Sequence, residues 1–263
     1  MSEKSAGPAV DPPQQASDDE LWANLRQFTV ARIGLARSGA SLATAPLLEF
    51  QLAHARARDA VHARLDHENL AAELSELGVP VVSVRSAAQD RQTYLMRPDL
   101  GRRLAADSVP SLAAHRSAYD VVFAVADGLS ARAVHRHARP VLAGAMAALR
   151  VEAWRVAPLV IVRYGRVAIG DAIAAALGAA CVAVLIGERP GLSAPDSMGA
   201  YLTWRPHPQT SDADRNCISN IRPEGIDYDT AGFKLVHLLR AMRARRLSGV
   251  RLKDESDQRL IGR

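Results

Sequence analysis

Two polar segments carry the side chains of this chain that are best suited to contact a ligand. Residues 185–192 (LIGERPGL) end a run of β-forming residues in a charged, glycine-flanked loop, and residues 214–221 (DRNCISNI) follow after a short stretch. An α/β fold presents backbone and side chains to a ligand in this way, at the end of a buried strand. The two segments together therefore predict a binding site.

The chemistry predicted for that site is binding and not catalysis. Cys217, expected in a polar loop, could form a thiolate with His207 as its base, but a cysteine that lines a ligand site needs no such role. The G-x-S-x-G nucleophile elbow, H-E-x-x-H and the two glycine-rich phosphate loops G-x-G-x-x-G and G-x-x-x-x-G-K-[ST] do not occur. We therefore assign no catalytic residue and no metal ligands to this chain.

Three apolar runs, at residues 120–126, 159–164 and 181–186, have to position the site. Each ends at a glycine-containing loop, and helical patterns at about 130–150 and 171–177 separate them. This alternation predicts an α/β fold with a Rossmann-like parallel sheet flanked by helices.

The loops that follow the three runs should meet at one edge of the sheet. Parallel strands joined by right-handed crossovers place all their carboxyl ends there. The loops in question are Asp127-Gly128, Tyr164-Gly165 and Gly187-Glu188. Their glycines are expected to let a bulky ligand approach the backbone closely.

The rest of the chain divides by composition. Four sections are predicted: a flexible tail at 1–17, a mostly helical N-terminal section at 18–78, the Rossmann-like domain at 79–250 and a charged tail at 251–263. Ser17 is the expected N-cap of a first helix, and Pro46 the first turn of a long helical segment. A last helix at 228–247, with arginines at its end that complement the helix dipole, should cover the sheet.

Amino-acid composition disfavours several classes of protein for this chain. The net charge is +5, but the basic residues are spread along the chain and aromatic residues make up only 5%, which disfavours a nucleic-acid binder. Two cysteines cannot build a disulfide framework, and neither a secretory signal nor an apolar run of membrane-spanning length occurs. An intracellular protein is expected.

Several long motifs resemble those of one family, the small (light) subunit of ethanolamine ammonia-lyase. The likeness covers about residues 32–250, and the segments that carry it are 49–61, 126–134, 162–167, 185–192 and 214–221. The resemblance implies a lyase that converts ethanolamine to acetaldehyde and ammonia by radical chemistry, with adenosylcobalamin as cofactor. It also implies a large subunit, a TIM-type barrel with most catalytic side chains, and an assembly of six of each subunit.

The resemblance places cobalamin contacts at Val167, Glu188 and Cys217. Val167 would offer apolar surface, Glu188 would accept hydrogen bonds from amides of the cofactor, and Cys217 would add a compact polarizable contact. Arg189 and Asn220 are secondary candidates, as donors to a phosphate or amides. The competing interpretation of Glu188 is an ion pair with Arg189 or Arg166.

Two further expectations complete the prediction, and two questions stay open. No histidine occurs in an Asp-x-His-x-x-Gly motif, so cobalamin is expected to bind base-on. A nucleotide-binding regulatory module with the same sheet is the alternative function. The compartment, a bacterial microcompartment or the cytoplasm, is not decided by the sequence.

Overall fold

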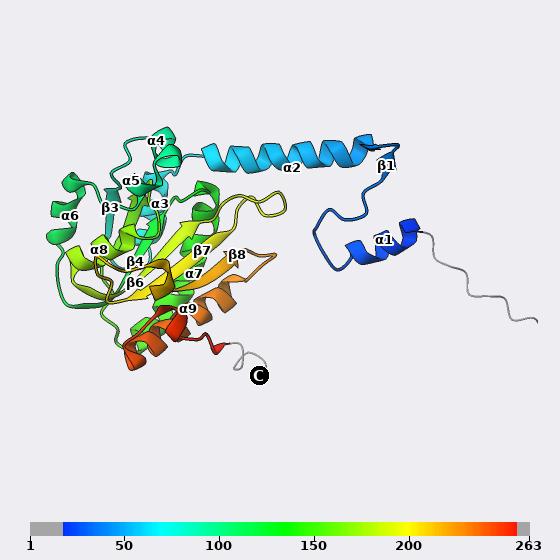
Figure 1. Cartoon of the computed structure of the whole chain (residues 1–263). Helices are drawn as coiled ribbons and strands as arrows, with labels where there is room; N and C mark the ends of the chain where they lie inside the picture. The colour runs from blue at the N-terminus through cyan, green and yellow to red at the C-terminus, as the bar shows by residue number, and fades with distance from the viewer. Residues whose placement is uncertain (1–17, 257–263) are drawn as a thin grey trace, which may run out of the picture. The chain divides into compact units, whose positions relative to one another are not determined.

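The computed structural model describes residues 18–256 (Figure 1), and the predicted tail at 1–17, with its N-cap at Ser17, lies outside that range, as do residues 257–263. The chain divides into two compact units after Ala53, inside helix α2 (Thr44–His62). Within the described range, no helix combines the length and the apolar character needed to cross a bilayer.

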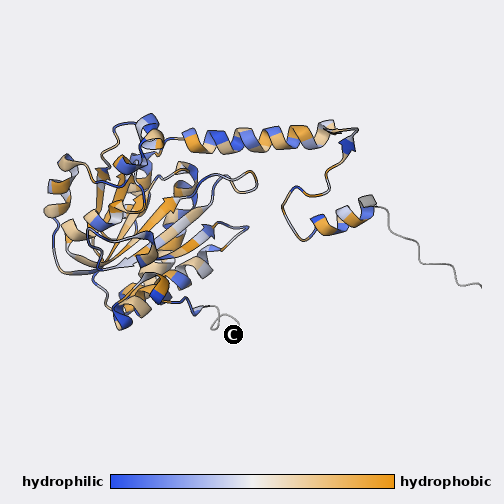
Figure 2. Ribbon diagram, in the orientation of Figure 1, coloured by the Kyte–Doolittle hydropathy of each residue, from blue (hydrophilic) through white to orange (hydrophobic). Residues whose placement is uncertain are grey.

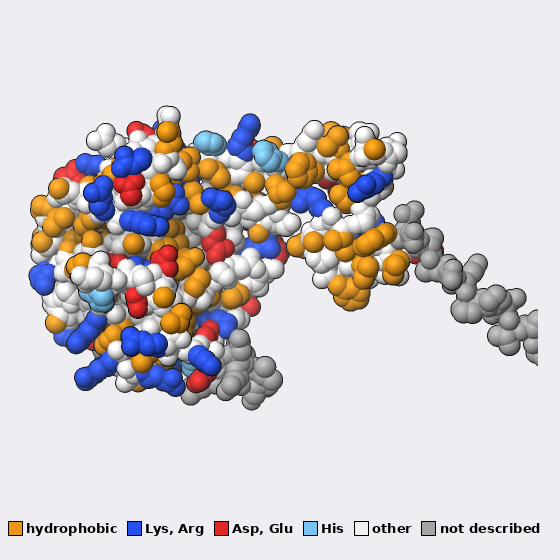
Figure 3. All heavy atoms as spheres, viewed as in Figure 1, with side chains coloured by type: hydrophobic (Ala, Val, Ile, Leu, Met, Phe, Trp, Pro, Cys, Tyr) orange, Lys and Arg blue, Asp and Glu red, His pale blue; other side chains and the backbone are white. Residues whose placement is uncertain are grey.

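The first unit contains helix α1 (Asp18–Arg26), a hairpin of β1 (Arg37–Ser38) and β2 (Ser41–Leu42), and the beginning of α2. Large apolar side chains remain on its surface. Phe28 is 86% exposed and Val30 is 76% exposed, and Figure 3 shows hydrophobic side chains gathered on this unit. The unit therefore contributes little to an apolar core.

The second unit is built on one six-stranded sheet in the order β3-β5-β4-β6-β7-β8. The strands are β3 (Val81–Arg85), β4 (Tyr119–Ala126), β5 (Leu159–Arg163), β6 (Ala179–Gly187), β7 (Met198–Trp204) and β8 (Arg215–Ile221). The first four strands in space are parallel, while β7 and β8 extend the sheet antiparallel to β6 and to each other. The predicted α/β fold is confirmed, and the sheet is mixed at its β8 edge.

The location predicted for Cys217 is wrong, because residues 215–221 form strand β8 and not a loop. Along β8, buried Ile218 and Ile221 face the core while Cys217 and Ser219 are exposed. An edge strand that is buried on one face needs few apolar residues. Its polar sequence therefore resembles that of a loop.

Helices cover both faces of the sheet and create two cores. Helices α3 (His67–Ser75), α7 (Ala131–Val151) and α9 (Tyr228–Arg245) enclose one core, and α6 (Val109–Ala113) and α8 (Ile169–Leu177) enclose the other. Figure 2 shows the apolar strands between these layers. Phe123 of β4 is fully buried, which stabilises the fold by roughly 1.5–3 kcal/mol relative to an exposed side chain.

The helices begin where local capping predicts. Ser130 accepts a hydrogen bond from Ala133 N at 3.4 Å at the start of α7, and Asp227 accepts one from Thr230 N at 2.8 Å at the start of α9. The shorter elements are α4 (Arg91–Met96), α5 (Pro98–Gly101), η1 (Ala106–Ser108), η2 (Asp212–Asp214) and η3 (Gly249–Arg251). The domain boundaries after residues 17, 78 and 250 stay predictions.

Candidate functional site

The loops that follow β4, β5 and β6 meet at one rim of the sheet, as predicted. Strand β4 lies between β5 and β6, so the three loops are neighbours. Leu129 N donates to Gly187 O at 3.0 Å, and Gly165 N donates to Asp127 Oδ1 at 3.2 Å. Backbone and side-chain hydrogen bonds thus join the loops into one surface, which we call the carboxyl rim.

The role predicted for the glycines of this rim is wrong, because the chain itself fills the space beside all three. A Cβ atom on Gly165 would lie 2.8 Å from Val162 Cγ1. A Cβ atom on Gly128, whose φ is +55°, would lie 2.3 Å from Gly187 O, and one on Gly187 would lie 2.1 Å from Ser130 O. The space beside these glycines is therefore filled by the chain's own atoms. They allow the loops to pack together and do not open a path to a ligand.

Asp127 is buried beneath the carboxyl rim and stabilises its loops. It is only 3% exposed, and its carboxylate accepts the backbone N–H of Gly165 and lies 3.8 Å from Arg91 Nη1. Burial raises the pKa of Asp127 to about 6, against the opposing effect of backbone N–H groups and of Arg91. Asp127 therefore positions loops and is not itself offered to a ligand.

Sequence reasoning missed two side chains from α4 that complete this arrangement. Arg91 donates to Gly128 O at 2.7 Å and to Val61 O at 2.9 Å, and the buried hydroxyl of Tyr94 donates to Gly165 O at 3.1 Å. These contacts span 30 to 71 residues of chain. No local pattern in residues 91–96 indicates them.

Glu188 and Asn220 lie together at the β6 and β8 side of the rim. The two carboxylate oxygens of Glu188 lie 3.2 and 3.3 Å from Asn220 N, which donates to them. Gly199 makes room for this contact, because a Cβ atom there would lie 2.9 Å from the carboxylate. Among residues 18–256, Glu188 forms no ion pair with Arg189 or Arg166 within 4 Å, so the competing interpretation finds no support.

Cys217 lies opposite Tyr201 in the β7–β8 pairing and hydrogen-bonds with it. Burial and the nearby carboxylate of Glu188 raise the pKa of the thiol, and the bond from Tyr201 opposes them in part. A raised pKa is the reverse of what a nucleophilic cysteine needs. The ring of His207 hydrogen-bonds to Gln209 at 3.2 Å instead of to Cys217, which disfavours the thiolate–imidazole alternative.

The two remaining predicted residues flank this group. Val167 lies in the loop between β5 and α8, half-buried against the same core as Tyr201, and therefore on the α8 face of the sheet that also carries Cys217. Arg189 follows Glu188 and is exposed. The structure thus joins Glu188 to Asn220 directly. Arg189 is in the same loop as Glu188, whereas Val167 is in the loop after β5, and the loop after β4 lies between the two.

Arg215 anchors this face, although sequence reasoning assigned it no role. Its guanidinium forms a two-point pair with the carboxylate of Asp171 on α8, at 2.8 and 2.7 Å, and also donates to Thr203 at 2.9 Å. Its side chain is only 2% exposed. The pair holds α8 against β8, beside the exposed Cys217.

The side chains of this surface are of types suited to binding a ligand. They offer a carboxylate acceptor, a protonated thiol, a half-buried valine and an exposed guanidinium, with no base held against a nucleophile. Residues 18–256 contain no group of three or more side chains that could hold a metal ion.

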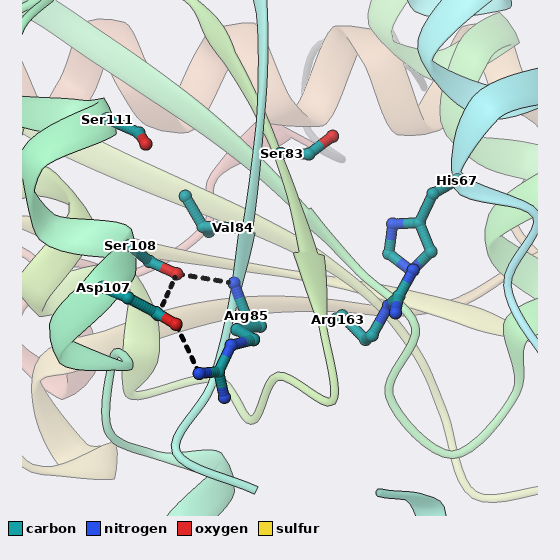
Figure 4. A pocket seen from close by; sticks show the side chains of 8 residues that line it. All are labelled: His67, Ser83, Val84, Arg85, Asp107, Ser108, Ser111 and Arg163. Atoms are coloured by element: carbon teal, nitrogen blue, oxygen red, sulfur yellow. Dashed lines mark hydrogen bonds and ion pairs between the residues drawn. The ribbon is translucent and has the colours of Figure 1, made fainter. Parts of the chain in front are cut away.

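A separate cavity of about 350 Å³ lies at the other edge of the sheet, along β3 (Figure 4). Arg85 forms an ion pair with Asp107 there, and Arg163 donates to His67 at 3.1 Å. Burial and then Arg163 lower the pKa of His67 to about 4. None of the predicted site residues lines this cavity.

Comparison with known proteins gives one consistent result. The family model described as Ethanolamine ammonia-lyase light chain (EutC) matches residues 19–253. A Xanthomonas campestris pv. campestris protein described as ethanolamine ammonia-lyase small subunit is 54% identical over 247 residues, which cover 92% of this chain and 91% of the relative. Proteins with the same description from Pseudomonas fluorescens (51% identity, 89% of this chain and 87% of the relative) and Ralstonia nicotianae (50%, 91% and 90%) are also similar.

Proposed function

This chain belongs to the ethanolamine ammonia-lyase light-chain family, and from that premise we propose that its carboxyl rim, with a separate large subunit, completes a binding site for adenosylcobalamin. The chain is the small subunit of a lyase. In the proposed enzyme, ethanolamine is converted to acetaldehyde and ammonia at the large subunit, and this chain contributes no catalytic side chain.

One observation carries the proposal: Glu188 and Asn220 lie together at the rim, and Cys217 lies beside Tyr201 on the α8 face near Glu188, with binding groups but no catalytic pairing. These groups fit a corrin. Its peripheral amides can donate to Glu188, whose two oxygens share a single backbone donor and so retain acceptor capacity. The exposed Cys217 and half-exposed Val167 offer a compact apolar surface to the ring.

Arg189 and Asn220 take the secondary roles in this proposal. The exposed guanidinium of Arg189 suits the phosphate of the nucleotide tail, and the amide of Asn220 suits the ring amides. Adenosylcobalamin supplies radical chemistry when it is bound. The residues of this chain bind and orient it and exclude water, and base-on binding is proposed because the chain lacks the histidine motif described above.

The test is cobalamin retention in the complex of this chain with its large subunit. We expect Glu188→Ala to weaken binding about tenfold, since a hydrogen bond to a charged group contributes roughly 1.5–3 kcal/mol. Glu76→Ala, which removes an exposed carboxylate paired with Arg139, is the matched control. Equal affinity in Glu188→Ala and wild type, measured by cobalamin absorbance after ultrafiltration, would contradict the assignment.

Two outcomes separate the rival functions. Tight binding of ATP or NAD without cobalamin would favour the nucleotide-binding regulatory module. Turnover of ethanolamine by the purified chain alone would refute its role as a non-catalytic subunit. The stoichiometry of six of each subunit and the compartment, microcompartment or cytoplasm, remain part of the proposal.

A further inference from the structure

A second large cavity lies at the opposite rim of the sheet, where β4 and β6 begin and β7 ends. Its volume is about 620 Å³. Four guanidinium groups line it, and we call them the arginine basin: Arg155, Arg205, Arg243 and Arg246. Arg155 precedes β5, Arg205 follows β7, and the other two lie at the end of α9, where Figure 3 shows basic side chains gathered.

The arginine basin is poorly neutralised. Its one acidic lining residue is Asp120, which lies 3.6 Å from the guanidinium of Arg155 and also accepts a hydrogen bond from the backbone N of Arg155 at 2.8 Å. Within residues 18–256, the other three arginines form no ion pair with a carboxylate within 4 Å. Arg243 interacts at longer range with Glu152, which is itself paired with Arg240. A concave surface lined by one sign of charge concentrates its field and attracts anions.

Aromatic rings position two of these guanidinium groups without consuming their donors. Arg243 lies over Trp154, 4.8 Å from the ring centroid, and Arg205 lies over Trp204 at 5.6 Å. Stacking fixes the plane of a guanidinium but leaves its N–H groups free to bind an oxyanion with two parallel hydrogen bonds.

The backbone conformation of two of these arginines also indicates a functional site. Arg205 and Arg246 are two of the five non-glycine residues with positive φ in the described range, at 41° and 54°. Glycine would occupy either position at lower conformational cost, and it is the usual residue at a helix end such as that of Arg246. Strained positions of this kind concentrate at functional sites.

The dipole of α9 accounts for only some of the four arginines of the basin. Arginines in the last turn of α9 complement its negative end, but Arg155 and Arg205 belong to other segments. We propose that the arginine basin binds a compact anion that carries several phosphate or carboxylate groups. The basin lies at the strand ends opposite to the carboxyl rim, so the inference goes beyond the cobalamin proposal and does not depend on it.

The experiment is isothermal titration calorimetry of inorganic tripolyphosphate into the full chain at about 50 mM salt. We expect saturable binding to one site, with Kd raised about tenfold or more in Arg205→Gly and in Arg246→Gly. Because glycine accepts positive φ, both variants should be at least as thermally stable as the wild type, which separates loss of the ligand from loss of the fold. Arg85→Gln removes an arginine from the cavity along β3 and is the matched charge control.

The result can overturn the proposal in three ways. Unchanged tripolyphosphate affinity in both glycine variants would exclude the basin as the binding site. An equal loss of affinity in Arg85→Gln would mean that only the net charge of the protein matters. If tripolyphosphate shows no saturable binding, a small polyvalent anion is excluded as the ligand. Tight binding of a polyglutamate peptide would not change that conclusion.

Discussion

Cys217 combines exposure with low expected reactivity. Its side chain is exposed on the α8 face, yet partial burial of the sulfur and the negative charge of Glu188 raise the pKa of the thiol. The neutral thiol is a soft, polarizable contact, whereas a thiolate would be a nucleophile and a metal ligand. The protonation state thus agrees with a residue that touches a ligand and does not attack it.

This pKa can be measured by alkylation. We expect the rate of iodoacetamide modification of Cys217, followed by peptide mass spectrometry, to reach half its maximum above the ordinary thiol pKa of about 8.5. Tyr201→Phe should move the midpoint higher, because the hydroxyl of Tyr201 stabilises the thiolate. Buried Cys181, whose pKa is raised to about 12, is the internal control and should react far more slowly. A midpoint at or below the ordinary value would contradict this account.

Asp127 should make stability depend on pH with a defined sign. Its pKa is raised in the folded chain to about 6, so folding favours the protonated carboxyl. That contribution is fully present below the unfolded pKa of about 3.9 and is lost as the pH rises through 6. We expect the free energy of unfolding of Asp127→Asn to decline less than that of the wild type between about pH 4.5 and about pH 7.

Chemical denaturation at several pH values measures this difference. Asp107→Asn is a control of opposite sign that acts at lower pH. Arg85 lowers the pKa of Asp107, so its stabilising contribution is lost only as the pH falls below the unfolded pKa of about 3.9. Parallel curves for Asp127→Asn and the wild type would show that Asp127 is not the group responsible.

Among the elements, α8 and β8 depend on one buried ion pair. Arg215 is almost fully buried, so removing its charge leaves Asp171 without a partner in a poorly hydrated place. We expect Arg215→Met to lower the free energy of unfolding by about 3 kcal/mol, measured by urea denaturation, and the double variant with Asp171→Leu to recover most of that loss. A double variant no more stable than Arg215→Met would contradict this explanation.

The elements also divide into those that the sequence predicts and those that it does not. The three apolar runs before Asp127, Gly165 and Gly187 are confirmed as parallel strands, because burial on both faces requires continuous apolar residues. Strand β8 was missed because an edge strand buries only one face. The contacts of Arg91 and Arg215 could not be predicted either, since they join segments far apart in the chain with no repeating pattern.

At the scale of the molecule, the sheet separates two kinds of surface. The carboxyl rim and the α8 face beside it carry the predicted cobalamin contacts, and the opposite rim carries the arginine basin. Strand direction causes this separation, because side chains near opposite ends of the same strands lie at opposite rims.

The first unit is expected to be dispensable for the stability of the second. Both apolar cores consist of residues after position 64, and none of their members comes from the first unit. Deleting residues 1–43 removes the chain up to the start of α2. We expect the thermal midpoint of the second unit, measured by circular dichroism, to stay within about 2 °C of its original value. The deletion should also reduce self-association in analytical ultracentrifugation, because it removes exposed side chains such as Phe28 and Val30. A fall of the midpoint by more than about 5 °C would mean that the first unit shares a core with the sheet.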